Sequence, residues 1–282
     1  MKKRFFLAFL VLFVAFCYRL GFPFWNTLKS YGIMPIYDLY MVKNSLLHQK
    51  GIGFFIPGGM KTKQKDWYPY MLHHHAGDAF SHYMGRQVSL DILYSFGHFD
   101  FWKGSSSFYN MDSPYYGAFY GGYAVFPQDQ NWIYGFDEDG NIDMEEIKKV
   151  PMFDQTYLVL PSIGLPTGKG IFRTKIKNIR YGQSYMREKD WVRIDAEIET
   201  NAPTHQAART NYPGYVQYGK PHNSYYQGQD YPIISLKGRI YVKYFEEYQG
   251  TFFLYVMARD EKILDECDQN FLSHAFIGMA GT

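Results

Sequence analysis

One stretch of the sequence predicts the fold class of this chain: Trp191-Val192-Arg193-Ile194-Asp195-Ala196-Glu197-Ile198-Glu199. From Val192 to Ile198 every second side chain is apolar, and charged side chains stand between them. Because successive side chains of a β-strand point to opposite faces, this pattern predicts a strand with one buried face and one wet face. Rougher patterns predict strands at about 171–181, 238–246 and 251–258. The run 252–257 lacks alternation, which indicates burial on both faces.

The composition supports a β-rich domain. Tyrosine (27) and phenylalanine (24) bring the aromatic content to 20%, which favours strands over helices. Apolar residues at helical spacing predict an amphipathic helix over about 35–50, either packed on the domain or lying at the membrane surface. They predict another helix that begins near Ile263 and runs to Phe276. Segments rich in glycine or proline predict loops at 51–66 and 201–232. We therefore expect one α+β domain over residues 26–282, with a mainly antiparallel sheet and flanking helices.

The N-terminal 25 residues predict a membrane segment. Lys2, Lys3 and Arg4 precede an uninterrupted apolar run from Phe5 to Cys17. A short basic region before an apolar core of about 7–15 residues is typical of a secretory signal, whereas a full membrane span needs about 20 residues. We interpret residues 1–25 as an uncleaved signal-anchor. A cleaved signal peptide is the second interpretation, and a buried helix of a cytosolic protein is the third. Either signal places residues 26–282 outside the cytoplasm, anchored or secreted.

Charge and cysteine content exclude two classes of protein. The net charge of +2 gives no electrostatic reason to expect a nucleic-acid partner. Of the two cysteines, Cys17 lies in the apolar run, so the domain carries only Cys267 and cannot be held together by internal disulfides. Cys267 falls on the apolar side of a predicted helix, which favours a buried, inert thiol.

The segment from His73 to His82 is the candidate metal site. If it is helical, His74, Asp78 and His82 fall at i, i+4 and i+8 on one face. Imidazoles and a carboxylate suit zinc or iron, and two ligands one turn apart can share an ion. Gly77 is a poor helix former, and the spacing matches no standard zinc motif. The other interpretation is a polar segment whose histidines have no common ligand, so that the protein holds no cofactor.

Two further segments resemble ligand loops only loosely. Residues 135–146 are acidic like an EF-hand loop, but Gly135 occupies the first ligand position. The pair Asp139-Gly140 favours a tight turn, so we predict a β-hairpin there. The glycine-rich segment 164–170 is one residue short of a phosphate-binding loop and ends in Gly170 instead of serine or threonine.

Aromatic side chains crowd the stretch from Tyr94 to Phe136. Five of them lie among glycines and are the candidate ligand contacts: Tyr115, Tyr116, Phe119, Tyr120 and Tyr123. If exposed, these rings would form a platform for sugar rings or apolar chains, with tyrosine hydroxyls as polar contacts. If buried, they form a core, which is the usual place for aromatic residues at this density.

Two functions follow from these patterns. The first is a membrane-anchored extracytoplasmic protein that binds an envelope protein, a glycan or a lipid through an aromatic-rich surface, without catalysis. The second is a metal-dependent extracytoplasmic hydrolase, in which His74, Asp78 and His82 hold zinc or iron. A metal-bound water would then attack the substrate, with His205 or His222 of the 201–232 loop as acid–base. The binding protein is the first choice.

Overall fold

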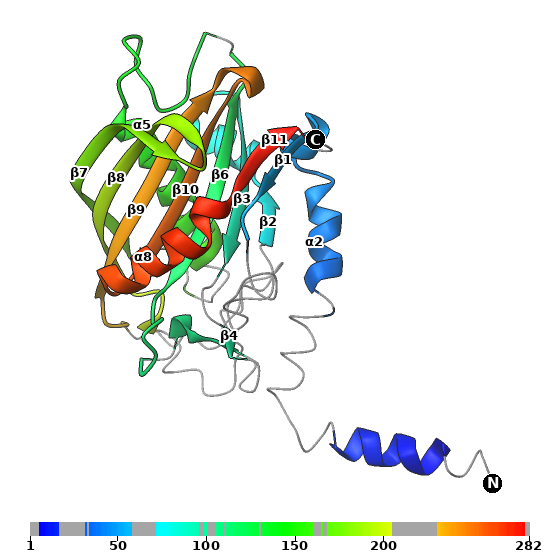
Figure 1. The fold of residues 1–282 in the computed structure, drawn as a ribbon. Helices are drawn as coiled ribbons and strands as arrows, with labels where there is room; N and C mark the ends of the chain where they lie inside the picture. The colour runs from blue at the N-terminus through cyan, green and yellow to red at the C-terminus, as the bar shows by residue number, and fades with distance from the viewer. Residues whose placement is uncertain are drawn as a thin grey trace.

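The computed structural model describes residues 6–16, 32, 34–57, 72–95, 99–100, 105–109, 111–129, 131–160, 165, 168–204 and 230–279. At its centre is a seven-stranded sheet in which all neighbouring strands are antiparallel (Figure 1). From edge to edge the order is β2 (Leu72–His75), β3 (Val88–Ser95), β6 (Phe119–Pro127), β10 (Gly250–Ala258), β9 (Ile234–Phe245), β8 (Glu188–Thr200) and β7 (Phe172–Tyr185). This confirms the α+β class with a mainly antiparallel sheet.

Short elements complete the fold. Two antiparallel ribbons pair β1 (Ile52–Phe55) with β11 (Phe276–Met279) and β4 (Phe99–Asp100) with β5 (Ser105–Ser106). The α-helices labelled in the structure are α2 (Met34–Val42), α3 (Leu46–Gln49), α4 (Gly77–Met84), α5 (Met144–Ile147), α6 (Lys149–Phe153) and α8 (Glu261–Asn270). A π-helix, η4 (Asp154–Val159), follows α6, and single 3₁₀ turns are η3 (Ser107–Tyr109), η7 (Glu246–Tyr248) and η8 (Leu272–His274).

The strand that decided the fold class is β8. Its apolar set Val192, Ile194, Ala196 and Ile198 is at most 7% exposed, whereas Glu197 and Glu199 on the other face are exposed. The predicted strands at 171–181, 238–246 and 251–258 correspond to β7, β9 and β10. Every residue of β10 is buried, which confirms the prediction made from its lack of alternation.

The sheet separates two hydrophobic cores. On one face α4, α5, α6 and η4 contribute Phe80, Ile147, Phe153 and Val159. On the other face the β1–β11 ribbon and α8 cover the strands. Cys267, which was predicted to be a buried thiol, is buried there. Both the packing and the pKa of Cys267, which burial raises well above its ordinary value, make it an inert core residue.

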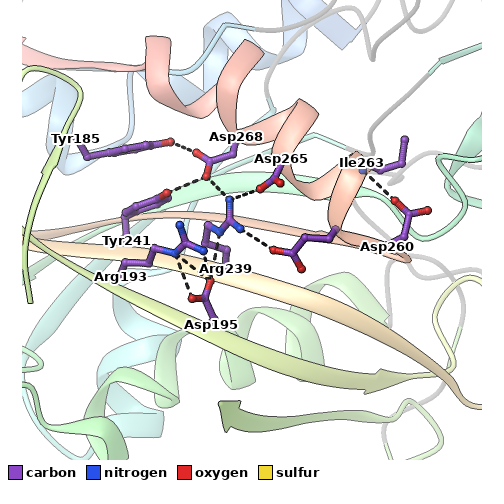
Figure 2. Close-up of polar contacts among 10 residues, drawn as sticks. Tyr185, Arg193, Asp195, Arg239, Tyr241, Asp260, Ile263, Asp265 and Asp268 are labelled. Atoms are coloured by element: carbon purple, nitrogen blue, oxygen red, sulfur yellow. Dashed lines mark hydrogen bonds and ion pairs between the residues drawn. The ribbon is translucent and has the colours of Figure 1, made fainter. Parts of the chain in front are cut away.

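A buried arginine fixes α8 to the sheet (Figure 2). Arg239 of β9 is 4% exposed, and its guanidinium bonds Asp268 at 2.6 Å, Asp265 at 2.8 Å and Glu261 at 2.9 Å, all on α8. On the sheet it also reaches Asp195 of β8 at 3.3 Å. Burial alone would lower the pKa of Arg239, but these carboxylates raise it above its ordinary value. The guanidinium therefore stays charged and holds α8 in one position on the strands.

Two tyrosines complete this cluster from the sheet side. Tyr185 of β7 and Tyr241 of β9 both donate their hydroxyls to Asp268, and their rings stack with centroids 3.8 Å apart. The guanidinium of Arg193 donates a hydrogen bond from Nε to Asp195 Oδ1 at 3.0 Å, and its Nη2 lies 2.9 Å from the same oxygen. The sequence pattern marked Arg193 and Asp195 only as the wet face of a strand, but here they support the α8 contact.

Several predicted element boundaries are wrong. The helix expected over 35–50 is two helices, because Ser45 accepts the N–H of His48 at 3.1 Å and starts α3 anew. The loop expected over 51–66 begins with β1, and its residues 58–66 lie outside the described residues. The closing helix ends at Asn270, and Phe276 begins β11 instead. At 134–143 the expected turn forms, but its arms meet in one isolated bridge between Phe136 and Ile142.

The N-terminal segment is only partly described. Residues 6–16 form a helix, and residues 1–5 and 17–31 lie outside the described residues. In the described part of the chain no helix combines the length and the apolarity that a membrane crossing requires. The signal-anchor therefore stays a prediction.

Candidate functional site

The residues predicted to bind a metal do not share a helix. His74 lies in β2 opposite Ile92 of β3, whereas Asp78 and His82 lie one turn apart on the exposed side of α4. The expected helix is wrong because pairing with β3 draws residues 72–75 into the sheet and α4 begins only at Gly77. Among the described residues, no three histidine, cysteine, aspartate or glutamate side chains form a group that could hold a metal ion. His205 and His222 lie outside the described residues.

The other two histidines of this run form carboxylate pairs. His75 Nδ1 lies 2.7 Å from Asp91 Oδ1, and this hydrogen bond raises the pKa of His75 against the effect of burial. The Asp91 carboxylate also accepts the N–H of Leu47 at 2.9 Å, at the start of α3. His73 Nδ1 lies 2.9 Å from Asp38 Oδ2 of α2. These pairs tie the edge strand β2 to β3 and α2, and Asp91 also holds α3.

The five aromatic residues predicted to contact a ligand lie mostly in the cores. Tyr116 is 5% exposed, and Phe119, Tyr120 and Tyr123 are at most 1% exposed. Tyr120 stacks on Phe271 beneath α8. Tyr115 is half-buried and donates its hydroxyl to Glu266 at 2.9 Å. Because β6 lies between β3 and β10 and both faces of the sheet are covered, Phe119, Tyr120 and Tyr123 are core residues, and the five rings form no exposed platform.

A groove of about 370 Å³ opens where the central strands β6 and β9 end. We call it the Trp132 groove, and its main wall residues are Lys50, Phe126, Gln128, Trp132, Tyr244 and Gln249. They come from the segment after α3, from the end of β6 and the loop beyond it, and from the end of β9 and the β9–β10 connection. Its volume lies within the range of about 300–1,000 Å³ that is usual for small-ligand sites.

Local hydrogen bonds hold the Trp132 side chain in place. The N–H of Trp132 donates to the carbonyl of Asp129 at 3.2 Å, which closes a turn directly after β6. The indole Nε1 donates to Glu146 Oε2 at 3.3 Å, and the same oxygen accepts the N–H of Gly135 at 2.7 Å. The ring is thereby fixed as a wall of the groove while remaining partly exposed.

Two cations lie on aromatic rings at this site. The guanidinium of Arg86 is 4.3 Å from the centre of the Trp132 ring, and Lys50 Nζ is 4.8 Å from the centre of the Phe126 ring. Lys50 also donates to the carbonyl of Tyr248 at 3.3 Å. Within the described part of the chain neither cation has a carboxylate at ion-pair distance. Both retain hydrogen-bond donors for an anionic group.

Other polar groups line the groove near these cations. The Gln249 backbone is in the left-handed region with φ of 50°, and its side-chain amide donates to the carbonyl of Glu246 at 2.7 Å. Burial, together with the nearby Glu246 carboxylate, raises the pKa of Tyr244, so its hydroxyl is a hydrogen-bond donor at neutral pH. Asp129 is the carboxylate in the groove wall.

A second hollow adjoins the groove on the α4 side. It has a volume of about 390 Å³ and is lined by Asp78, Ser81, His82, Gly85, Arg86 and Gln87. Arg86 is shared, because it lines this hollow and stacks on Trp132. The N–H of Gln128 donates to the carbonyl of Gln87 at 3.1 Å and joins the two rims. Two of the predicted metal residues therefore lie beside the groove, and His74 does not line either hollow.

Sequence reasoning missed the groove because its walls come from segments far apart in the chain. Phe126 and Trp132 lie in the aromatic stretch that was singled out, but no local pattern connects them with Lys50 or Gln249. Comparisons with protein-family models, curated proteins and solved structures found no match to this chain.

Proposed function

We propose that this chain is a non-catalytic binding protein that holds an acidic glycan in the Trp132 groove. We also propose that residues 1–25 are a signal-anchor, which keeps the domain at the extracytoplasmic face of a membrane. The observation that carries the binding proposal is the groove itself. An indole and a phenol ring stand in its walls together with two amides and Lys50, and Arg86 lies on the Trp132 ring from the adjoining hollow. Neither cation has a carboxylate partner in the described chain.

The chemistry of the walls favours a sugar over a lipid. Aromatic rings pack on the apolar faces of sugar rings, while amides and carboxylates hydrogen-bond sugar hydroxyls. The enclosed apolar cavity between the sheet and α5–α6 has a volume of about 40 Å³, which is too small for a lipid chain. For comparison, an apolar cavity that admits benzene holds about 150 Å³. Lys50 and Arg86, which have no carboxylate partner among the described residues, further favour a glycan with carboxylate groups.

The membrane part of the proposal rests on the sequence. Lys2, Lys3 and Arg4 before the apolar run 5–17 are typical of a secretory signal. The hydrolase alternative has no comparable support, since Asp78 and His82 have no third ligand group among the described residues.

The binding proposal is tested by calorimetric titration of the full chain in detergent micelles. The probes are an oligogalacturonate and its carboxyl-reduced form. We expect saturable binding of the acidic form, and weaker binding by about tenfold, which corresponds to ~1.4 kcal/mol, for the reduced form. Arg86→Ala should weaken binding of the acidic form by a similar factor, because it removes the charged donor that lies on the Trp132 ring beside the groove. Trp132→Ala should do the same by removing the stacking wall.

Lys189→Ala is the matched control, because Lys189 is an exposed cation at the β7–β8 end of the sheet and lines neither hollow. It should bind like the unmodified chain. Equal binding of both probes would refute the role of the cations. Failure of both probes to bind, or unchanged binding by Arg86→Ala and Trp132→Ala, would refute the groove as the site.

A further inference from the structure

The polarity of α2 is inverted relative to that of a helix on a water-facing surface. Its outward side chains Ile36, Leu39 and Tyr40 are 71%, 67% and 66% exposed. They follow the i, i+3, i+4 spacing of one helix stripe. The only charged residue of the helix, Asp38, points toward the domain, where its carboxylate accepts the N–H of His73 at 2.7 Å and pairs with its ring at 2.9 Å. A surface helix normally shows the opposite arrangement.

The chain that precedes α2 is apolar as well. Residues 5–42 contain three charged side chains, Arg19, Lys29 and Asp38, and two of these are cations. Residues 6–16 form a helix with every side chain exposed. At 1.5 Å per residue its eleven residues extend roughly 16 Å, about half of the ~30 Å hydrocarbon core of a bilayer. The segment therefore has the length to enter one leaflet.

We propose that the outward stripe of α2 lies in the interfacial layer of a lipid bilayer, alongside the membrane segment proposed for the N-terminus. This inference rests on the membrane part of the proposed function and adds a second contact, which sets the orientation of the domain. Charge agrees with this occupant, because Asp38 is paired inward, Lys43 directly follows the helix, and the two charged residues of the sequence between the N-terminal helix and α2, Arg19 and Lys29, are both cations. Cations near an apolar helix favour anionic lipid headgroups.

The helix α2 is attached to the main sheet. The Asp38–His73 pair joins α2 to β2, and β2 is hydrogen-bonded to β3 in the main sheet. A bilayer that holds Ile36, Leu39 and Tyr40 would therefore hold the whole domain at one angle. A tether made by residues 1–25 alone would leave the domain free to turn.

The test uses the full chain with Cys17→Ser, purified in detergent and reconstituted into vesicles of phosphatidylethanolamine and phosphatidylglycerol. Cys267 is buried and stays unlabelled in the folded protein. Single cysteines introduced as Leu39→Cys, Leu12→Cys or Lys189→Cys carry an environment-sensitive fluorophore. We expect blue-shifted emission and quenching by a shallow lipid-borne quencher at positions 12 and 39, and quenching by aqueous iodide at position 189.

Each other outcome overturns the proposal in a distinguishable way. A probe at position 39 that iodide quenches, while the probe at 12 is in lipid, leaves the tether intact and refutes the α2 contact. A probe at 12 that stays in water refutes the tether and the inference together. Shielding at 39 that grows with protein density in the vesicles assigns the stripe to a second copy of the chain. As a further variant, Ile36→Asp should return the probe at 39 to water without moving the probe at 12.

Discussion

Arg239 is the residue on which the contact between α8 and the sheet depends. It is 4% exposed and forms ion pairs with four carboxylates, of which Asp268 is itself buried. Removing one partner of a buried ion pair leaves an uncompensated charge, and this costs more than the pair contributes by its presence. The sheet face below α8 therefore tolerates an arginine only because the helix brings its carboxylates to it.

We expect Arg239→Met to lower the free energy of unfolding by about 3–5 kcal/mol. The methionine fills the volume of the arginine stem but leaves Asp268, which is 5% exposed, without its cation. Urea denaturation followed by circular dichroism measures the change. Lys175→Met is the control, since Lys175 is exposed on β7 and should change stability by less than about 0.5 kcal/mol. Equal stability of the two variants would contradict the role of Arg239.

Among the elements, the β7–β8 hairpin shows a local conflict between sequence and conformation. Its two turn residues, Met186 and Arg187, have φ of 53° and 67°, so both lie in the left-handed region. This is the turn type that matches the twist of two antiparallel strands, but it favours asparagine and glycine. A non-glycine residue costs roughly 1–2 kcal/mol in this conformation. The length of β7 and β8 and their pairing override the turn preference.

Arg187→Gly should relieve this strain and stabilise the protein by about 1 kcal/mol, which raises the melting temperature by roughly 2–4 °C. Arg187 is exposed, so little packing is lost. Thermal unfolding measures the shift. The paired control is Lys189→Gly, two residues further on in β8, where glycine weakens an extended strand and should lower the melting temperature. A drop for both variants would mean that Arg187 is not strained.

At the scale of the whole molecule, one buried carboxyl group makes stability depend on pH. Burial raises the pKa of Asp154 from its ordinary 3.8 to about 7, against the hydrogen bond that Tyr123 donates to it at 2.7 Å. A carboxyl group whose folded-state pKa is raised favours the folded state most below its unfolded pKa. That contribution is lost as the pH rises from about 3.8 to about 7.

Asp154→Asn should remove this dependence, because an amide keeps an acceptor for Tyr123 and never ionises. Relative to the unmodified chain, the variant should gain stability between pH 4 and pH 8, by an amount on the order of 4 kcal/mol. Urea denaturation of both proteins at the two pH values measures this difference. The same pH dependence in both proteins would show that Asp154 does not titrate in this range.

The sequence by itself determined the fold class and the main strands. Alternation from Val192 to Ile198 predicted β8 and its buried face, and the unbroken apolar run 252–257 predicted a strand covered on both sides. These predictions succeed because the direction of a side chain in a strand is fixed by the backbone alone.

Local periodicity does not show which segments lie next to each other in space. That information came only from the tertiary structure. The run at His74 fits a helical spacing, yet pairing with β3 made it a strand. Tyr120 and Tyr123 were candidate contacts of an exposed platform, yet the place of β6 between β3 and β10 buried them. The Trp132 groove joins segments near residues 50, 130 and 249, so it exists only once the sheet has formed. Periodicity is a property of neighbours along the chain, whereas burial and sites are properties of neighbours in space.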